Sequence, residues 1–129
     1  MSAVSFMLRD RLSKKDVAGV LSGFQATADE DGWTFPIGNG YTDMAVEIGD
    51  NNGLKAIPPA MVKQSARALG IQFGKPKTRL VVMWFQDEDD FLWSWVFRLA
   101  RAFNERWRVV VLSHTSVLYT DLTPRGMPA

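Results

Sequence analysis

Apolar residues recur along the chain with two different periods, and these periods separate the expected strands from the expected helices. Within residues 41–48, every second position from Met44 onward is apolar, which is typical of a strand with one buried and one exposed face. Residues 33–37 form another candidate strand, and the Gly-Asn-Gly sequence between the two favours a tight turn. These features predict an antiparallel hairpin over residues 33–48.

Helical spacing marks three other segments. Ser13 begins the sequence Ser-Lys-Lys-Asp, which is similar to a capping box, and apolar residues follow it at helical intervals. Pro58 and Pro59 are typical of the first turn of a helix, which we expect to end near Gly70. The longest expected helix spans residues 88–107. Its apolar stripe comprises Leu92, Trp95, Val96, Leu99, Ala102 and Phe103.

Two nearly continuous apolar runs flank that longest helix. They cover residues 78–86 and residues 108–113, and such runs are typical of strands that are buried on both faces. If the two strands pair in parallel, they form a right-handed βαβ-like unit together with the 88–107 helix.

The length and composition indicate one ordinary globular domain. The chain has 129 residues, of which 47% are hydrophobic and 22% are charged. We expect a single domain over residues 1–129, with residues 1–12 as an N-terminal arm or short helix and residues 123–129 as a frayed tail. The fold class that these elements predict is α+β (mixed α/β), with a mixed, mostly antiparallel sheet and helices packed on it.

The absence of cysteine removes several kinds of chemistry. Disulfides, thiol nucleophiles and cysteine-ligated metals are excluded. A chain without disulfides suits a reducing compartment, and its first residues lack the basic region of a signal peptide, so a cytoplasmic protein is expected. No apolar run reaches the roughly 18 residues that span a bilayer, so no membrane association is expected.

Charge is distributed unevenly along the chain. Residues 1–54 contain four basic and eight acidic residues, whereas residues 55–129 contain eleven basic and six acidic ones. The tract from residue 55 to residue 79 is basic, and if its cations converge in space they can bind the phosphates of a nucleic acid or a nucleotide. The simpler interpretation is a solvated face that is balanced by the acidic half of the molecule. The candidate anion-binding residues are Lys63, Arg67, Lys75, Lys77 and Arg79.

Candidate catalytic and metal-binding groups have simpler structural explanations. His114 follows the 108–113 strand and could act as a general base with Asp121, but a turn histidine bonded to the backbone is the favoured interpretation. Residues 87–90, with the sequence Asp-Glu-Asp-Asp, could bind Mg²⁺, but carboxylates at a helix N-terminus are accounted for by capping. We therefore expect no catalytic constellation, no metal and no cofactor, and a binding protein rather than an enzyme.

Two aromatic residues of the longest helix lie outside the centre of its apolar stripe. Trp93 and Phe97 are one turn apart, and Arg98 and Arg101 follow them on the polar side. Large aromatics with an arginine rim are typical of a protein-binding surface, including the interface of a homodimer. A helix that is buried on more than one side would account for the two aromatics equally well.

No residue pattern identifies a family, and the exclusions therefore decide the functional hypothesis. We expect a non-enzymatic domain that binds, and inhibits, a protein partner, by analogy of size with bacterial immunity proteins and antitoxins. The first alternative is binding of nucleic acid or nucleotide phosphates through the basic tract of residues 55–79. The second alternative is a small enzyme that depends on carboxylates.

Overall fold

The structure, a computed structural model, describes residues 2–37, 43–49, 76–84, 90–113 and 118–119. The helices are α1 (Lys14–Leu21), the 3-10 turn η1 (Ser22–Phe24) and α4 (Asp90–Asn104). The strands are β1 (Ser2–Leu8), β2 (Thr27–Ala28), β3 (Trp33–Pro36), β4 (Asp43–Ile48), β5 (Thr78–Trp84), β6 (Val109–Ser113) and β7 (Leu118–Tyr119). The helix expected after Pro58 and the tail expected over residues 123–129 lie outside the described residues.

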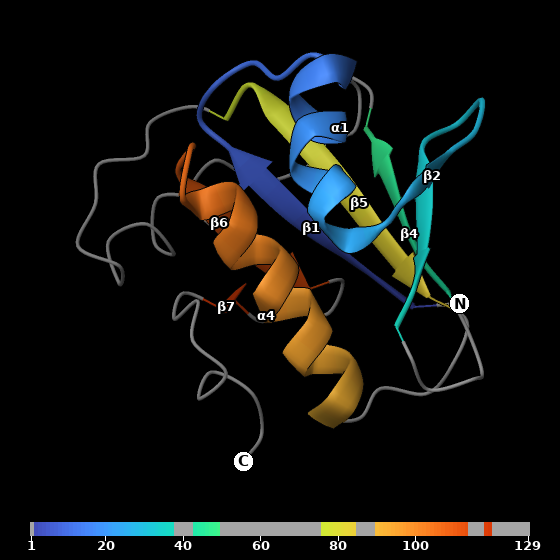
Figure 1. The fold of residues 1–129 in the computed structure, drawn as a ribbon. Helices are drawn as coiled ribbons and strands as arrows, with labels where there is room; N and C mark the ends of the chain where they lie inside the picture. The colour runs from blue at the N-terminus through green and yellow to red at the C-terminus, as the bar shows by residue number, and fades with distance from the viewer. Residues whose placement is uncertain (1, 38–42, 50–75, 85–89, 114–117, 120–129) are drawn as a thin grey trace.

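The strands form one sheet in the order β2-β3-β4-β5-β1-β6-β7, and every pairing between these strands is antiparallel. Both helices lie on the same face of this sheet (Figure 1). The fold is therefore of the predicted α+β class. The predicted hairpin is also present, since β3 and β4 pair with each other.

The parallel pairing proposed within a βαβ-like unit is not found. β5 and β6 do not pair with each other, because β1 lies between them and is hydrogen-bonded to both. The two strands still run in the same direction, since each is antiparallel to β1, and α4 connects them across the helix-covered face (Figure 1). The expected arm or short helix over residues 1–12 is not found, because residues 2–8 form a central strand.

The strand register explains why β1 belongs in the centre of the sheet. Val4, Phe6 and Leu8 alternate with Ser5 and Met7, and all three lie on the helix-covered face with less than a tenth of their surface exposed. Phe6 contacts Phe103 of α4 edge-on, with 6.3 Å between the ring centroids. These contacts bury the apolar side chains of β1. Its neighbouring strands, β5 and β6, come from the second half of the chain.

Helix α1 begins with the capping box that its sequence predicts. The Ser13 hydroxyl accepts a hydrogen bond from the Asp16 N–H (3.2 Å), and the Asp16 carboxylate accepts one from the Ser13 N–H (2.9 Å). Val17, Val20 and Leu21 are the buried residues of this helix and pack on the sheet. The cap sets the start of α1 and so fixes the direction of the loop that leaves β1.

The core between α4 and the sheet is made almost entirely of apolar side chains. Trp84 at the end of β5 is fully buried and meets Trp93 of α4 edge-on, with centroids 6.1 Å apart. The Trp84 indole N–H has no hydrogen-bond partner among the described residues, so its burial there is driven by its apolar surface. None of the described helices is long and apolar enough to cross a membrane.

Candidate protein-interaction surface

The buried side of α4 is wider than its sequence suggested, and this corrects the proposed binding residues. Trp93 and Phe97, expected at the margin of the helix as partner-binding anchors, are 3% and 0% exposed. Their ring centroids are 6.0 Å apart, and Trp93 packs on Trp84 of the sheet. In this conformation both side chains are therefore covered by the protein itself and are not accessible to a partner. The other interpretation, a helix buried on more than one side, fits their burial.

The opposite side of α4 presents a different pair of aromatics. Phe91 is the one large apolar side chain among the described residues that is strongly exposed, at 44%. Trp95, one turn later, is half-buried, and residues four apart lie next to each other on a helix surface. We define the α4 surface as Phe24, Phe91, Trp95, Arg98 and Arg101.

Trp95 is held in place by aromatic contacts from other elements. Its ring centroid lies 6.3 Å from that of Phe24 in η1 and 6.2 Å from that of Phe35 in β3. Phe24 and Phe35 contact each other at 5.4 Å. Since Phe35 is buried and Phe24 and Trp95 are half-buried, this cluster extends from the core to the surface.

The conformation of the turn after η1 places Phe24 in this cluster. Gln25 has a φ of 59° and is the one non-glycine residue with positive φ among the described residues. Its N–H donates to the Ser22 carbonyl, which closes the turn and directs the chain into β2. The surface is therefore supported by backbone geometry as well as by ring packing.

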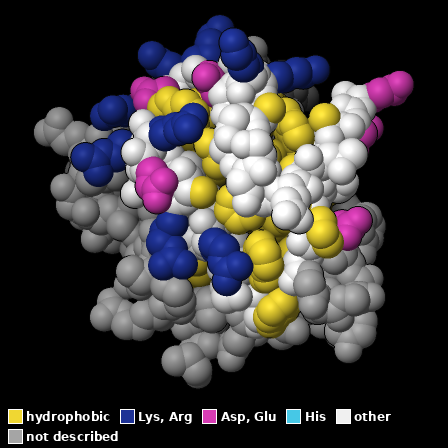
Figure 2. Space-filling view, viewed as in Figure 1, with side chains coloured by type: hydrophobic (Ala, Val, Ile, Leu, Met, Phe, Trp, Pro, Cys, Tyr) yellow, Lys and Arg dark blue, Asp and Glu magenta, His cyan; other side chains and the backbone are white. Residues whose placement is uncertain are grey.

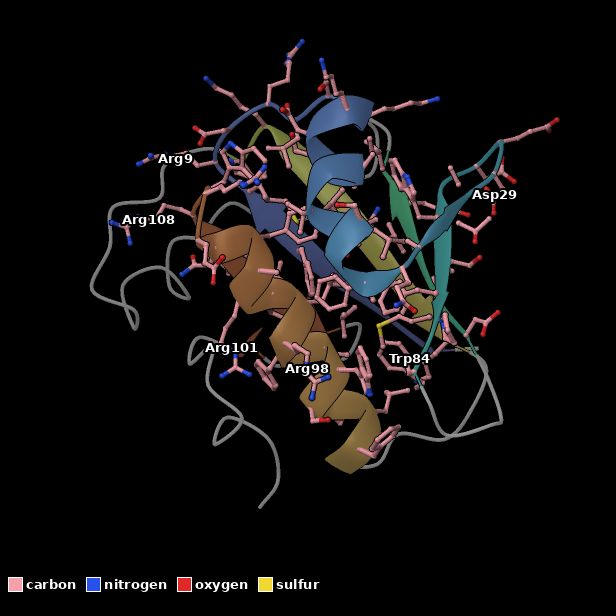
Figure 3. All side chains as sticks on the ribbon, in the orientation of Figure 1. Arg9, Asp29, Trp84, Arg98, Arg101 and Arg108 are labelled. Atoms are coloured by element: carbon pink, nitrogen blue, oxygen red, sulfur yellow. The ribbon has the colours of Figure 1, made fainter. Side chains whose placement is uncertain are left out.

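Two arginines complete the α4 surface, and the sequence predicted Arg98 and Arg101 on the polar side of this helix, beside Trp93 and Phe97. The guanidinium carbon of Arg98 lies 4.4 Å from the centroid of the Trp95 ring, within the range of a cation–π contact. Both arginines are exposed, and both lie along the outer side of α4 (Figure 3). The arrangement thus combines a supported tryptophan, an exposed phenylalanine and two cations.

The sequence contained a signal for this surface. Residues 91, 95, 98 and 102 follow helical spacing and place two aromatics beside Arg98. The sequence pattern places Trp95 in the buried stripe. It cannot fix which residues are buried most deeply, because the rotation of a helix about its own axis depends on what the helix packs against. The stripe on α4 is rotated towards Trp93 and Phe97, whose neighbour Trp84 comes from another part of the chain.

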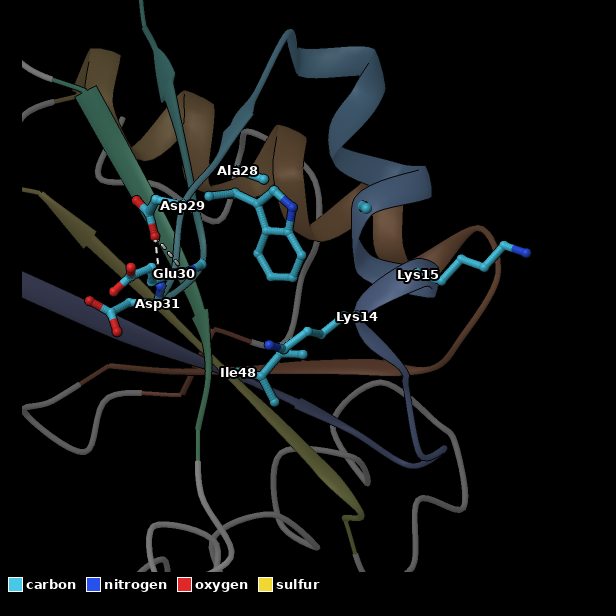
Figure 4. A pocket seen from close by; sticks show the side chains of 10 residues that line it. Lys14, Lys15, Ala28, Asp29, Glu30, Asp31 and Ile48 are labelled. Atoms are coloured by element: carbon cyan, nitrogen blue, oxygen red, sulfur yellow. Dashed lines mark hydrogen bonds between the residues drawn. The ribbon is translucent and has the colours of Figure 1, made fainter.

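A cleft of about 540 Å³ lies between α1 and the turn that joins β2 to β3 (Figure 4). Lys14 of α1 faces the acidic turn formed by Asp29, Glu30 and Asp31, whereas Lys15 points away from it. The Asp29 carboxylate is engaged within the turn, where it accepts hydrogen bonds from the N–H groups of residues 31 and 32, both at 2.8 Å. The walls of the cleft therefore carry opposite charges, with one lysine facing three carboxylates.

Gly32 is required where that turn meets β4. A Cβ atom at this position would lie 2.1 Å from the Val46 carbonyl oxygen, so any side chain would push the strands apart. The walls of the cleft are therefore set by strand packing.

Most of the predicted anion-binding and catalytic residues lie outside the described part of the chain. This holds for Lys63, Arg67, Lys75, His114 and residues 87–89. Lys77 is exposed at the start of β5, and Arg79 is half-buried with its Nε donating to the Ser5 hydroxyl (3.0 Å). Across the described ranges, no group of three or more histidine, aspartate or glutamate residues could hold a metal ion.

Comparison with known proteins adds no further constraint on the site. No family model, no curated protein and no solved structure matches this chain.

Proposed function

We propose that the protein is a non-enzymatic binding domain that contacts another protein through the α4 surface. The observation that carries this proposal is the exposed Phe91 beside Trp95, with the Arg98 guanidinium 4.4 Å above the Trp95 ring. Tryptophan and arginine are the residue types that most often supply binding energy at protein interfaces. An aromatic that is already packed on two other rings loses little conformational freedom when a partner covers it.

The chemistry of the α4 surface defines the partner it fits. Phe91 and Trp95 offer apolar area, and Arg98 and Arg101 border it with two positive charges. A complementary surface would present an apolar side chain flanked by carboxylates, because arginine pairs with carboxylates in a bidentate geometry.

Within this proposal, the partner is inhibited by being covered. The class that we infer is a small bacterial inhibitor of the immunity-protein or antitoxin kind, working in the cytoplasm. The protein's short length and lack of cysteine support that class. A homodimer formed through the same surface is the competing outcome of the experiment below.

The test begins with the tagged protein as bait in lysate of its own source, followed by affinity measurements with the purified partner. Phe91→Ala and Arg98→Ala are the informative variants, because both side chains are exposed and their removal leaves the core intact. We expect each substitution to weaken binding by about tenfold or more, the range found for interface residues that dominate affinity. Glu30→Ala, an exposed residue of the β2–β3 turn, is the control and should leave the affinity unchanged.

Two results would refute the proposal. One is a partner that binds wild type, Phe91→Ala and Arg98→Ala equally well. The other is a protein that retains no partner and sediments as a monomer at micromolar concentration. A dimer that dissociates on Phe91→Ala substitution would keep the surface but identify a second copy of this chain as its occupant.

A further inference from the structure

Three basic residues lie side by side where the central strands of the sheet begin or end. Leu8 of β1 pairs with Thr78 of β5 on one side and with Val109 of β6 on the other. The residues directly beyond these three in the chain are Arg9, Lys77 and Arg108, and all three are exposed. We define them as the basic row. Since neighbouring strands are about 5 Å apart, the three backbones leave the sheet within about 10 Å of one another.

Other cations surround the basic row at the same end of the molecule. Arg106, between α4 and β6, lies against α1, since a Cβ atom on Gly19 would be 3.7 Å from its Nη1. Arg106 and Lys15 both help to lower the pKa of Asp16, so their positive field reaches the start of α1. Together, this basic end carries seven cations and three carboxylates, a net charge of +4. Its cations are Arg9, Arg11, Lys14, Lys15, Lys77, Arg106 and Arg108, and its acids are Asp10, Asp16 and Glu105.

Lys14 of this end faces the acidic turn of residues 29–31, but little within the described part of the chain neutralises the basic row itself. The ion pair recorded there joins Arg9 Nε to Asp10 at 3.8 Å, with both side chains nearly half exposed. Like charges on neighbouring strands repel each other, so a row of three cations lowers the stability of the fold unless an anion binds there. As far as the described residues show, the cations of the row therefore repel one another in the isolated protein, and a bound anion would relieve that repulsion.

We infer that the basic row binds the phosphodiester backbone of a nucleic acid. Its cations come from three adjacent chain segments and lie in a line rather than around a pocket, which fits a linear series of phosphates better than a single anion. Arg9 and Arg108 extend on the same side of the molecule (Figure 3). Contacts of this kind supply affinity without reading base sequence.

The rest of the surface favours nucleic acid over an anionic membrane. Membrane-surface binding needs exposed apolar side chains beside the cations. Phe91, the one strongly exposed large apolar residue of the described part, is at the opposite end of α4 from Arg106. The basic end therefore offers charge without an apolar anchor.

Acidic residues at the other edge of the sheet would orient the polyanion. The segment from residue 17 to residue 54 contains no lysine or arginine, and its carboxylates include Asp29, Glu30, Asp31 and Asp43 on the β2–β4 side. In Figure 2 the basic side chains gather over the upper and left parts of the molecule with some acidic ones among them, and on the right acidic side chains project without basic neighbours. A polyanion is thus attracted to one end and repelled from the other.

The test compares two double variants that remove the same charge. Arg9→Gln with Arg108→Gln removes two cations of the basic row, and Arg98→Gln with Arg101→Gln removes two from the α4 surface. Binding of a labelled 20-nucleotide DNA, single-stranded and duplex, is followed by fluorescence anisotropy from 50 to 200 mM salt. We expect the basic-row variant to bind at least about tenfold more weakly at 50 mM salt, with a salt dependence reduced by about two units of slope. The α4 variant should stay within about twofold of wild type.

Three outcomes would overturn the inference. They are wild-type protein that fails to bind either DNA at 50 mM salt, equal losses in the two double variants, and binding to phosphatidylserine vesicles without binding to DNA. Thermal unfolding of the basic-row variant should match or exceed that of wild type, because it removes repulsion, and this separates lost binding from lost folding. The α4 variant should still lose the protein partner, so this inference and the proposed function can fail independently.

Discussion

The interior between α4 and the sheet and the basic end of the molecule are built on opposite principles. In the interior, Phe97 and Phe103 are fully buried among other apolar side chains. At the basic end, like charges lie next to one another, and Thr78 is the one buried polar residue in the described part of the chain. The interior accounts for most of the stability of the fold, whereas at the basic end the described cations outnumber the carboxylates that they can stabilise.

The difference between the apolar interior and the basic end separates residues that stabilise the fold from residues that are available for binding. Burial of apolar surface is favourable wherever it occurs, so core residues need no ligand to account for them. A group of cations with few carboxylates beside it in the described part of the chain repels itself, and the anion binding that we infer above would relieve this repulsion. The two regions should therefore respond very differently to substitution.

The largest effect is expected in the interior, at Phe97. Phe97→Ala removes a fully buried ring that packs on Trp93, and we expect a loss of about 3–5 kcal/mol in the free energy of unfolding. Urea denaturation of wild type and variant measures this loss. The matched control is Phe91→Ala, the same chemical change at an exposed position of the same helix, which should cost less than about 0.5 kcal/mol. Equal losses at the two positions would contradict the burial of α4 described above.

An intermediate effect is expected at the basic end, at Thr78. Its hydroxyl accepts a hydrogen bond from the Leu12 N–H (2.9 Å) and donates one to the Asp10 carbonyl (2.8 Å). Thr78→Val keeps the shape but leaves both backbone groups without this partner, and we expect a loss of about 1–3 kcal/mol in chemical denaturation. Thr78→Ser keeps the hydroxyl and should retain more stability than Thr78→Val. If serine were the more disruptive substitution, the two hydrogen bonds would not be what stabilises this loop.

The smallest effect is expected from Asp16, and it depends on pH. Hydrogen bonding with the backbone and side chain of Ser13 lowers the pKa of Asp16, and the positive charges of Arg106 and Lys15 lower it further. Because the folded state holds the lower pKa, the ionised carboxylate stabilises the fold above its unfolded pKa, near 4, and this contribution is lost as the pH falls through the folded pKa. Asp16→Asn should therefore lower the melting temperature slightly at pH 7 and less at pH 3. A difference between variant and wild type that stays constant over this range would exclude the carboxylate as its cause.

The fold was more accessible from the sequence than the site was. The capping box at Ser13, the β3–β4 pairing and the burial of residues 109–112 follow from short-range patterns, and the structure has all of them. Full burial of β5 on both faces is not found, because its buried residues alternate with the half-buried Arg79, Val81 and Met83. The place of β1 did not follow, because its partners are formed by residues about 70 and 100 positions later in the chain. A seven-residue alternating segment is compatible with an arm or a strand until those partners are known.

The candidate surfaces show the same limit. The sequence predicted Arg98 and Arg101 as exposed cations of a binding helix, and their exposure is confirmed. The sequence pattern places Trp95 in the buried stripe and Trp93 at its margin. Which of the two is the more deeply buried depends on where Trp84 and Phe35 lie, and these come from other strands. Along the sequence, the charge divides into an acidic first half and a basic second half. The fold instead brings Arg9 of the first half beside Lys77 and Arg108 of the second.

The sequence by itself determined the α+β class, the start of α1, the apolar character of the central strands and the absence of cysteine chemistry. Each of these depends on composition or on residues a few positions apart, whose contacts are set by helix and strand geometry. The tertiary structure alone decided the strand order, the rotation of α4 and the gathering of seven cations at one end. These features depend on pairing between distant segments, and local propensity contains no information about which distant segment a strand will meet.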